Sequence, residues 1–192
     1  MTAGRRSAIV LIGFMGAGKT TVGRALAQRL NWLFEDLDDR IVEREGRSVT
    51  EIFRNSGEPA FREAEHAALR GLLSELHAGA AKVIALGGGA FAQKRNSALL
   101  KAAGIPIVFL DAAVETLWKR CCQHAEQTGA QRPLLQNMDQ FRELYESRRK
   151  AYSRASVRIS TEQRNVDAIA AEIAGSLGLK EIAVRSELGE VE

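Results

Sequence analysis

The feature that most constrains this chain is a glycine-rich segment near its beginning. Residues 13–20 are GFMGAGKT and match the pattern GxxxxGK followed by Ser or Thr. The segment follows a short apolar run, residues 8–12, and precedes an amphipathic stretch, residues 21–30. In this strand–loop–helix context the pattern holds nucleotide phosphates, whereas a plain glycine turn would not need the complete pattern. The chain therefore contains a candidate phosphate-binding loop.

Each position of this loop has a chemical reason. Glycines let the backbone curl so that successive N–H groups face one centre, and the start of the following helix adds partial positive charge. Lys19 would neutralise the β and γ phosphates of ATP, and the Thr20 hydroxyl would be a ligand of Mg²⁺. The predicted ATP contacts in this segment are Gly13, Gly16, Ala17, Gly18, Lys19, Thr20 and Thr21.

Apolar runs rich in Val and Ile alternate with helical patterns along the chain. The three longer runs are residues 8–12, 82–86 and 105–110, and the two shorter ones are residues 32–35 and 157–160. Such runs are typical of buried parallel strands. The helical patterns include residues 21–30, a capping box that starts at Ser48, a stretch from Pro59 to about 76, and residues 112–121 and 166–178. We predict an α/β three-layer sandwich with a five-stranded parallel sheet and a P-loop NTPase fold.

Length and composition indicate one compact domain. The 192 residues are 45% hydrophobic, which suits a single core, because such cores span about 100 to 200 residues. We expect residues 1–180 to form this domain and residues 181–192 to form a polar C-terminal tail.

Charge and cysteine usage exclude several function classes. The net charge is +3, and Lys and Arg are intermixed with Asp and Glu, which indicates a solvated surface and no nucleic-acid partner. The first apolar run is too short for a secretion signal or a membrane span. The neighbouring Cys121 and Cys122 cannot connect distant elements, and together with His124 they lack zinc spacing. We therefore expect a cytoplasmic protein without a membrane partner.

Two carboxylates follow the second predicted strand. Asp36 and Asp38 lie two residues apart in FEDLDD, where an extended chain would point both side chains to one side. One could hold a Mg²⁺-bound water while the other orients or deprotonates a hydroxyl. The alternative is that Asp38 or Asp39 caps a helix that begins at Arg40.

Three glycines follow the strand predicted at residues 82–86. Many P-loop NTPases have a Mg²⁺-binding aspartate there, but this chain has Gly87, Gly88 and Gly89. Glycines at this point serve either close backbone approach to a ligand or an unusual dihedral path. Asp111 is a competitor for the missing role, but its position directly before a helical pattern favours a helix cap.

Six segments in order resemble the shikimate kinase family. They are GFMGAGKTTVG, FEDLD, SVTEIFRNSGEPAFREAE, ALGGG, QRPLL and ESRRKAY, and the resemblance runs from about residue 9 to residue 177. It implies transfer of the ATP γ-phosphoryl group to the 3-hydroxyl of shikimate, within chorismate and aromatic amino-acid synthesis. It also implies a monomer that uses Mg²⁺.

The resemblance also assigns residues to an acid site. Asp38 would bind the ring hydroxyls and act on the attacking one, and Asp36 would lie on the Mg²⁺ water shell. Arginines would hold the carboxylate because their geometry is bidentate. The implied substrate contacts are Asp38, Phe53, Phe61, Arg62, Gly87, Gly88, Gly89 and Arg148. The two phenylalanines could equally be ordinary core residues.

The resemblance implies a mobile lid over both substrates. The lid would cover about residues 123–136, and Arg132 would swing onto the phosphates as a catalytic group. Arg164 would lie near the adenine, although Asn165 and Val166 depart from the RxP string that is common in the family.

Three alternatives remain at this stage. A kinase for another small hydroxy acid such as gluconate, or for a nucleoside monophosphate, would share the phosphate loop but not the combined FRxxE and GGG segments. A non-catalytic effector-binding domain would need a DNA-reading module, and only about seven residues precede the first strand.

Overall fold

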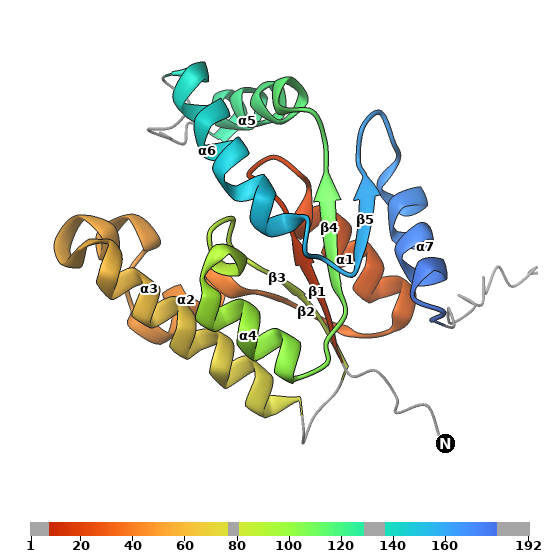
Figure 1. The fold of residues 1–192 in the computed structure, drawn as a ribbon, viewed down its shortest axis with the longest axis horizontal. Helices are drawn as coiled ribbons and strands as arrows, with labels where there is room; N and C mark the ends of the chain where they lie inside the picture. The colour runs from red at the N-terminus through yellow and green to blue at the C-terminus, as the bar shows by residue number, and fades with distance from the viewer. Residues whose placement is uncertain (1–7, 77–80, 129–136, 180–192) are drawn as a thin grey trace, which may run out of the picture.

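The computed structural model describes residues 8–76, 81–128 and 137–179, which form a parallel sheet covered by helices on both sides (Figure 1). The strands are β1 (Ala8–Ile12), β2 (Leu33–Asp36), β3 (Lys82–Ala85), β4 (Ile107–Asp111) and β5 (Val157–Ser160). The helices are α1 (Lys19–Leu30), α2 (Leu37–Glu45), α3 (Val49–Glu75), α4 (Lys94–Ala102), α5 (Val114–Thr128), α6 (Met138–Tyr152) and α7 (Val166–Ser176), with a 3₁₀ turn η1 at Ala90–Ala92.

All five predicted strands are present and all pair in parallel, in the order β2-β3-β1-β4-β5. The central strand β1 is buried along its whole length, whereas the edge strands β2 and β5 are partly exposed. The burial pattern explains why β1 is continuously apolar while the edge strands β2 and β5 contain charged residues. The predicted α/β class and five-stranded parallel sheet are confirmed.

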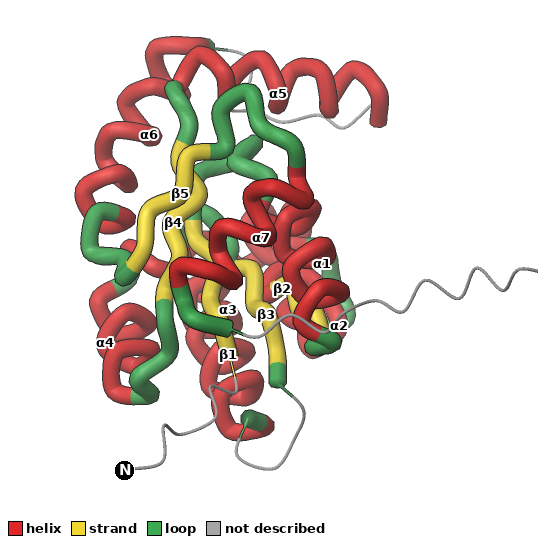
Figure 2. Tube along the Cα trace, turned by 90° about the vertical axis from the view of Figure 1, so that its right-hand side faces the viewer, coloured by secondary structure: helices red, strands yellow, loops and turns green. Residues whose placement is uncertain are grey.

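The helices form the two outer layers of the sandwich (Figure 2). Helices α1 and α7 pack together on one face of the sheet, and α3 packs with α4 on the other. Helix α5 lies beyond the carboxyl ends of the strands, and α6 runs from there to β4, where Tyr152 packs against Phe109 (Figure 1). Because the strands are parallel, the loops that follow β1, β2, β3 and β4 all emerge at this one edge.

The start of α2 differs from the sequence prediction. The helix begins at Leu37 and not at Arg40, and its cap is Asp36, whose carboxylate accepts a hydrogen bond from the Asp38 backbone N–H. Neither Asp38 nor Asp39 is the cap, because both lie inside the first turn. The sequence predicted an extended chain with the Asp36 and Asp38 side chains on one side. Asp38 instead lies in the first turn of α2, so this part of the prediction is wrong.

The start of α3 agrees with the prediction. Ser48 and Glu51 form the capping box, with each side chain bonded to the backbone N–H of the other residue. Gly57 interrupts the helix at φ 77°, a left-handed conformation that favours glycine, and Pro59 opens the segment that follows. This kink separates the part of α3 that holds Phe53 from the part that holds Arg62.

Asp111 is not a helix cap, contrary to the sequence prediction. It ends β4, and helix α5 begins only at Val114. The Asp111 carboxylate instead accepts a hydrogen bond from Arg158 Nε on β5 at 2.8 Å and one from the Tyr145 hydroxyl on α6. It therefore joins β4 to its neighbours and has no contact with the phosphate loop among the described interactions.

The predicted lid lies partly within helix α5, which extends to Thr128. Residues 123–128 are helical because they contain no glycine or proline before Gly129. The rest of the lid, including Arg132, and the C-terminal tail lie outside the described residues. Of the helices in the described ranges, none has the length and apolar character needed to cross a bilayer.

Candidate active site

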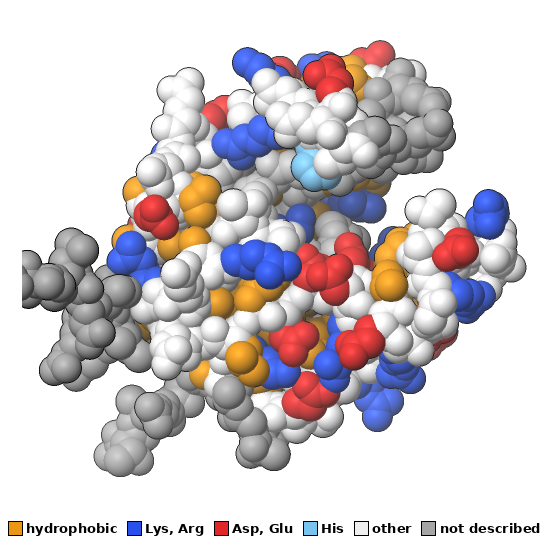
Figure 3. Space-filling model, turned by 180° about the vertical axis from the view of Figure 1, so that it is seen from behind, with side chains coloured by type: hydrophobic (Ala, Val, Ile, Leu, Met, Phe, Trp, Pro, Cys, Tyr) orange, Lys and Arg blue, Asp and Glu red, His pale blue; other side chains and the backbone are white. Residues whose placement is uncertain are grey.

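The carboxyl edge of the sheet contains a cavity of about 680 Å³. The phosphate loop, the end of β2, the turn after β3, helices α5 and α6, and the start of α7 contribute to its walls. Figure 3 shows the molecule hollowed between the part that holds α5 and the rest of the body, with acidic and basic side chains at the hollow. A cavity at this edge of an open parallel sheet is the expected position for a ligand.

The phosphate loop has the conformation that its glycines predict. Gly16 and Gly18 have φ values of 79° and 89°, which L side chains rarely adopt, and Gly18 caps the start of α1. Gly16 also has no room for a side chain, because an added β-carbon would lie 2.8 Å from the Leu117 carbonyl oxygen. The N-terminus of α1 therefore faces the cavity, in a conformation suited to binding an anion.

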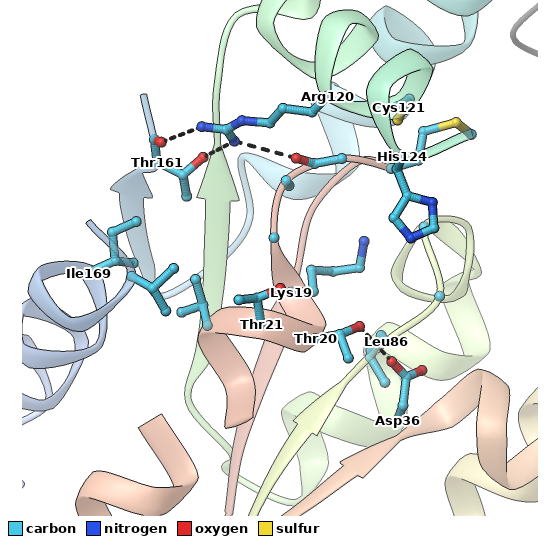
Figure 4. Close-up of a pocket in the computed structure, with 18 of the residues that line it drawn as sticks. Lys19, Thr20, Thr21, Asp36, Leu86, Arg120, Cys121, His124, Thr161 and Ile169 are labelled. Carbon is cyan, nitrogen blue, oxygen red and sulfur yellow. Dashed lines mark hydrogen bonds between the residues drawn. The ribbon is translucent and has the colours of Figure 1, made fainter. Parts of the chain in front are cut away.

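Lys19 extends into the cavity from the first turn of α1 (Figure 4). Its ammonium donates hydrogen bonds to the carbonyl oxygens of Gly13 at 3.0 Å and Phe14 at 3.1 Å. Burial lowers the pKa of Lys19, and the nearby carboxylates of Asp38 and Asp36 oppose that shift. The charge is therefore held at the loop, where phosphates would lie.

Thr20 and Asp36 form the oxygen pair that a hard divalent cation needs. The Thr20 hydroxyl donates a hydrogen bond to Asp36 Oδ2 at 3.0 Å, and the other carboxylate oxygen caps α2 (Figure 4). Hydroxyl and carboxylate oxygens are the ligands that Mg²⁺ prefers, directly or through water. The residues present therefore fit the predicted metal position, although no cluster of three or more acidic, His or Cys side chains occurs in the described ranges.

Asp38 lies between the two predicted halves of the site. Its carboxylate lines the cavity, and burial raises its pKa, with the neighbouring Asp36 raising it further and Lys19 opposing the shift. Gly87 lies directly against it, since an added β-carbon at Gly87 would be 2.6 Å from Asp38 Oδ1. A poorly solvated carboxylate with a raised pKa is the type of group that acts as a proton acceptor.

The other two glycines of the turn lie against the two predicted substrate arginines. An added β-carbon at Gly88 would be 3.0 Å from Arg148 Nη1, and one at Gly89 would be 2.8 Å from Arg62 Nη1. None of the three glycines has a positive φ in the range where glycine is favoured. The alternative of an unusual dihedral path is therefore wrong. The three glycines leave room for charged side chains, and close approach of their backbone to a ligand stays a prediction.

Glu65, to which sequence reasoning assigned no role, binds Arg62. It is 1% exposed, and both of its carboxylate oxygens lie 3.2 Å from Arg62 Nη1. Burial raises the pKa of Glu65, and the charge of Arg62 opposes that shift. A second carboxylate, Glu58, accepts hydrogen bonds from Arg62 Nε and Nη2. The sequence signal for these contacts was helical spacing, since Glu58 lies four residues before Arg62 and Glu65 lies three residues after it.

Arg148 is held from two sides. Its guanidinium lies 5.6 Å from the ring centre of Phe14 in the phosphate loop, and it interacts with the Tyr152 hydroxyl one turn further along α6. Burial raises the pKa of Tyr152 to about 12, so its hydroxyl remains protonated, and it donates a hydrogen bond to the Gly88 carbonyl oxygen. Arg148 therefore has a defined position next to the glycine turn.

Phe53 and Phe61 form a pair with ring centres 4.5 Å apart. Phe61 is buried at 4% exposure, whereas Phe53 is 39% exposed, so the pair has both a core part and a solvent-facing part. The Arg62 guanidinium lies 5.3 Å from the Phe61 ring centre. Neither ring is among the residues that line the 680 Å³ cavity, so the structure places them beside Arg62 and beyond this cavity.

The opposite end of the cavity contains a second residue that sequence reasoning missed. Arg120 on α5 donates hydrogen bonds to the Thr161 carbonyl oxygen at 2.7 Å and to the Thr161 hydroxyl at 3.0 Å, and it also reaches the Gly16 carbonyl oxygen (Figure 4). The predicted Arg164 lines the same end together with Val166 and Ile169. Aliphatic side chains beside guanidinium groups suit a flat aromatic base.

The fold and the cavity define a P-loop kinase that acts on a small molecule. The sheet order, the complete phosphate loop and a charged pocket beside it support this class. A model of the family described as shikimate kinase matches residues 15–177. The chain belongs to the shikimate kinase family.

Individual relatives agree with this assignment. The chain is 38% identical to a shikimate kinase from Persephonella marina over 170 residues, which cover 88% of this chain and 98% of the relative. It is 42% identical to one from Geobacter sulfurreducens, with 86% and 88% covered. A solved structure, "Shikimate kinase from Acinetobacter baumannii in complex with shikimate", has a TM-score of 0.78 at 34% identity, with 89% and 92% covered.

Proposed function

We propose that this protein transfers the γ-phosphoryl group of ATP to the 3-hydroxyl of shikimate, giving shikimate 3-phosphate and ADP for chorismate and aromatic amino-acid synthesis. The observation that carries this proposal is the glycine turn after β3, whose three residues lie against Asp38, Arg148 and Arg62 in turn. The turn brings one acid–base group and two guanidinium groups together beside the phosphate loop. The names of the relatives support the choice of substrate.

The two arginines are suited to a carboxylate. Guanidinium groups donate paired hydrogen bonds to carboxylate oxygens, with a geometry that lysine lacks. Glu58 and Glu65 hold Arg62, and Phe14 and Tyr152 hold Arg148, so little side-chain freedom remains to be lost on binding. The backbone of the glycine turn would lie against the ring of the acid, with Phe53 and Phe61 near its outer side.

Asp38 would orient the attacking hydroxyl and accept its proton. Burial raises its pKa, which makes the carboxylate a better base than that of an ordinary aspartate. The positions of Lys19 and Arg148 near Asp38 would limit the attacking hydroxyl to the space between them. The proton would pass from the hydroxyl oxygen to the Asp38 carboxylate as the new P–O bond forms.

The phosphates would lie along the loop and the start of α1. Lys19 would neutralise the negative charge that shifts toward the β–γ bridging oxygen, and loop N–H groups would bind the other oxygens. Thr20 would hold Mg²⁺ directly and Asp36 would hold it through water. The ion would supply positive charge that neutralises the phosphates. Arg132 stays a prediction for the transferred phosphate, since it lies outside the described residues.

A coupled assay of ADP release tests this proposal. Purified protein with Mg²⁺ and ATP would be given shikimate, gluconate or a nucleoside monophosphate in separate reactions. Of the three acceptors, we expect only shikimate to raise ADP release above the background hydrolysis of ATP, and to do so by orders of magnitude. Preferred turnover of gluconate or a nucleotide would reject shikimate as the substrate, and no turnover with any acceptor would favour an effector-binding role.

We also propose that residues 1–180 act as one domain, as a cytoplasmic monomer. The described residues share one hydrophobic core, which supports a single domain. Neither Cys121 nor Cys122 forms a disulfide within the described residues, which supports a reducing compartment. Sedimentation analysis at micromolar concentration would test the monomer directly.

A further inference from the structure

One face of α5 borders the nucleotide end of the cavity. Leu117, Arg120, Cys121 and His124 lie at positions i, i+3, i+4 and i+7, which is the spacing of a single helical face. The last three line the cavity, and the Leu117 carbonyl oxygen lies against Gly16. The face therefore contacts the phosphate loop and continues along α5 to His124, which lies one turn beyond Cys121.

The position of this face is determined by contacts on the phosphate loop and on the loop after β5. Arg120 binds Thr161 through two hydrogen bonds and reaches the Gly16 carbonyl oxygen. The Cys121 thiol is buried, and an added β-carbon at Gly16 would lie 2.9 Å from its sulfur. Helix α5 is thus closely packed against the loop at two successive residues, which restricts where the next turn can lie.

His124 is placed by that next turn. Its side chain is exposed to solvent, yet it lines the same cavity as Lys19 and Thr20. Figure 4 shows the imidazole ring extending from α5 into the cavity, on the side of the phosphate loop away from Thr161. A core role is excluded by its exposure, and a zinc site is excluded because no ligand cluster occurs in the described ranges.

We propose that His124 is a phosphate-binding residue of the nucleotide site. An imidazole N–H would donate a hydrogen bond to a terminal phosphate oxygen of ATP or ADP, opposite the loop N–H groups and Lys19. The inference rests on the proposed function only in that the nucleotide lies in the phosphate loop. The proposed hydrogen bond to phosphate comes from a helical residue of the predicted lid and does not depend on Arg132.

A histidine donor gives the proposal a second test, which is the pH dependence of nucleotide affinity. Histidine changes charge between about pH 5 and 8, and a cationic donor binds phosphate more strongly than a neutral one. The charged or titratable groups that share the cavity are Lys19 on α1, Asp36 and Asp38 at the start of α2, Arg120 and Cys121 on α5, Arg148 on α6, and Arg164 before α7. These groups are common to the parent and to His124 variants, so a difference between them reports on His124.

Three variants test the proposal: His124→Ala, His124→Arg and Lys119→Ala. Lys119 is a matched control because it is an exposed cation on the same helix that does not line the cavity. Equilibrium binding of Mg²⁺–ATP and Mg²⁺–ADP would be measured by calorimetry between pH 6 and 8.5 without the acid substrate. A failure of shikimate as substrate would not affect this measurement.

We expect His124→Ala to weaken binding of both nucleotides by about tenfold at pH 6, because a hydrogen bond to a charged group is lost. The loss should be smaller at pH 8.5 than at pH 6. His124→Arg should restore the affinity and remove its extra pH dependence, and Lys119→Ala should bind like the parent. The proposal is overturned if His124→Ala binds within twofold of the parent at pH 6, or if it matches Lys119→Ala.

Discussion

The two ends of the cavity are built in different ways. At the nucleotide end, residues 13–21 supply most of the predicted phosphate contacts from one continuous segment. At the acid end, Asp38 on α2 and Arg148 on α6 line the cavity, and Arg62 on α3 lies beyond its lining. The three meet only at the glycine turn after β3. The first end depends on local backbone conformation, whereas the second depends on how distant elements pack.

This difference has a chemical cause. Phosphate oxygens can be bound by backbone N–H groups of a curled loop, so the required information is mainly the spacing of glycines. A carboxylate and a ring of hydroxyls need particular side chains at particular angles, and several elements must supply them. Mutations at the nucleotide end should therefore act through charge, and mutations at the acid end should act through position.

The largest effect is expected for Lys19→Ala at the nucleotide end. The variant removes the charge next to the transferred phosphate, so kcat should fall by roughly 10³-fold or more while the fold is retained. Steady-state kinetics together with circular dichroism would check both statements. Activity within about tenfold of the parent would show that the phosphate loop does not supply the charge that catalysis requires.

Asp38→Asn tests the point where the two ends meet. The substitution keeps the shape but removes the base, so kcat should fall by roughly 10²-fold while ATP still binds. Asp39→Asn, one residue further along α2, should have little effect. Equal losses in the two variants would mean that Asp38 has no special role in the reaction.

The raised pKa of Asp38 gives this test a pH signature. Because the reaction needs the ionised carboxylate, kcat/KM of the parent should fall as the pH decreases through a value above that of an ordinary aspartate. The kcat/KM of Asp38→Asn should not show this fall as the pH decreases. Its thermal midpoint should equal or exceed that of the parent, because a buried carboxylate with a raised pKa destabilises the folded state at neutral pH.

Arg148→Ala should weaken the acid end selectively. A hydrogen bond to a charged group is worth about 1.5 to 3 kcal/mol, and 1.4 kcal/mol is about tenfold in affinity. Shikimate affinity should therefore fall by more than about tenfold while ATP affinity changes little. Arg149→Ala is the matched control, since the neighbouring Arg149 is exposed and packs on Tyr145. A selective loss of ATP affinity in Arg148→Ala would move this residue to the nucleotide end.

Gly87→Ala should have the smallest effect on activity, because it acts only through position. The new β-carbon would lie 2.6 Å from Asp38 Oδ1, so the carboxylate must move, and kcat should fall by roughly tenfold. Gly71→Ala near the C-terminal end of α3 is the control, because nothing lies within 4 Å of its added β-carbon. It should keep full activity and stabilise the protein by about 0.5 to 1 kcal/mol. Full activity in Gly87→Ala would remove the close-approach argument.

Some helices and strands could be predicted from the sequence more accurately than others. All five strands were predicted because buried parallel strands are short, continuous apolar runs. The capping box at Ser48 was also predicted, since its two hydrogen bonds lie within one turn. The start of α2 was missed by three residues, because Asp36, Asp38 and Asp39 are all plausible caps and only the packing of α2 selects Asp36.

The site shows the same division. Lys19 and Thr20 could be placed from their spacing alone, whereas the roles of Arg62 and Arg148 came from a family resemblance. Arg120 was missed because its partner Thr161 is distant in sequence, so no local pattern marks the pair.

The sequence by itself determined the sheet, the phosphate loop and the chemical class of the protein, because these depend on hydrophobic periodicity and on glycine spacing within a few residues. Only the tertiary structure decided that each glycine of the GGG turn lies against a different charged group, and that Arg120 and His124 lie at the nucleotide end. The physical reason is that side-chain contacts between separate elements are set by the packing of the core. The spacing of residues along the chain does not encode these contacts locally.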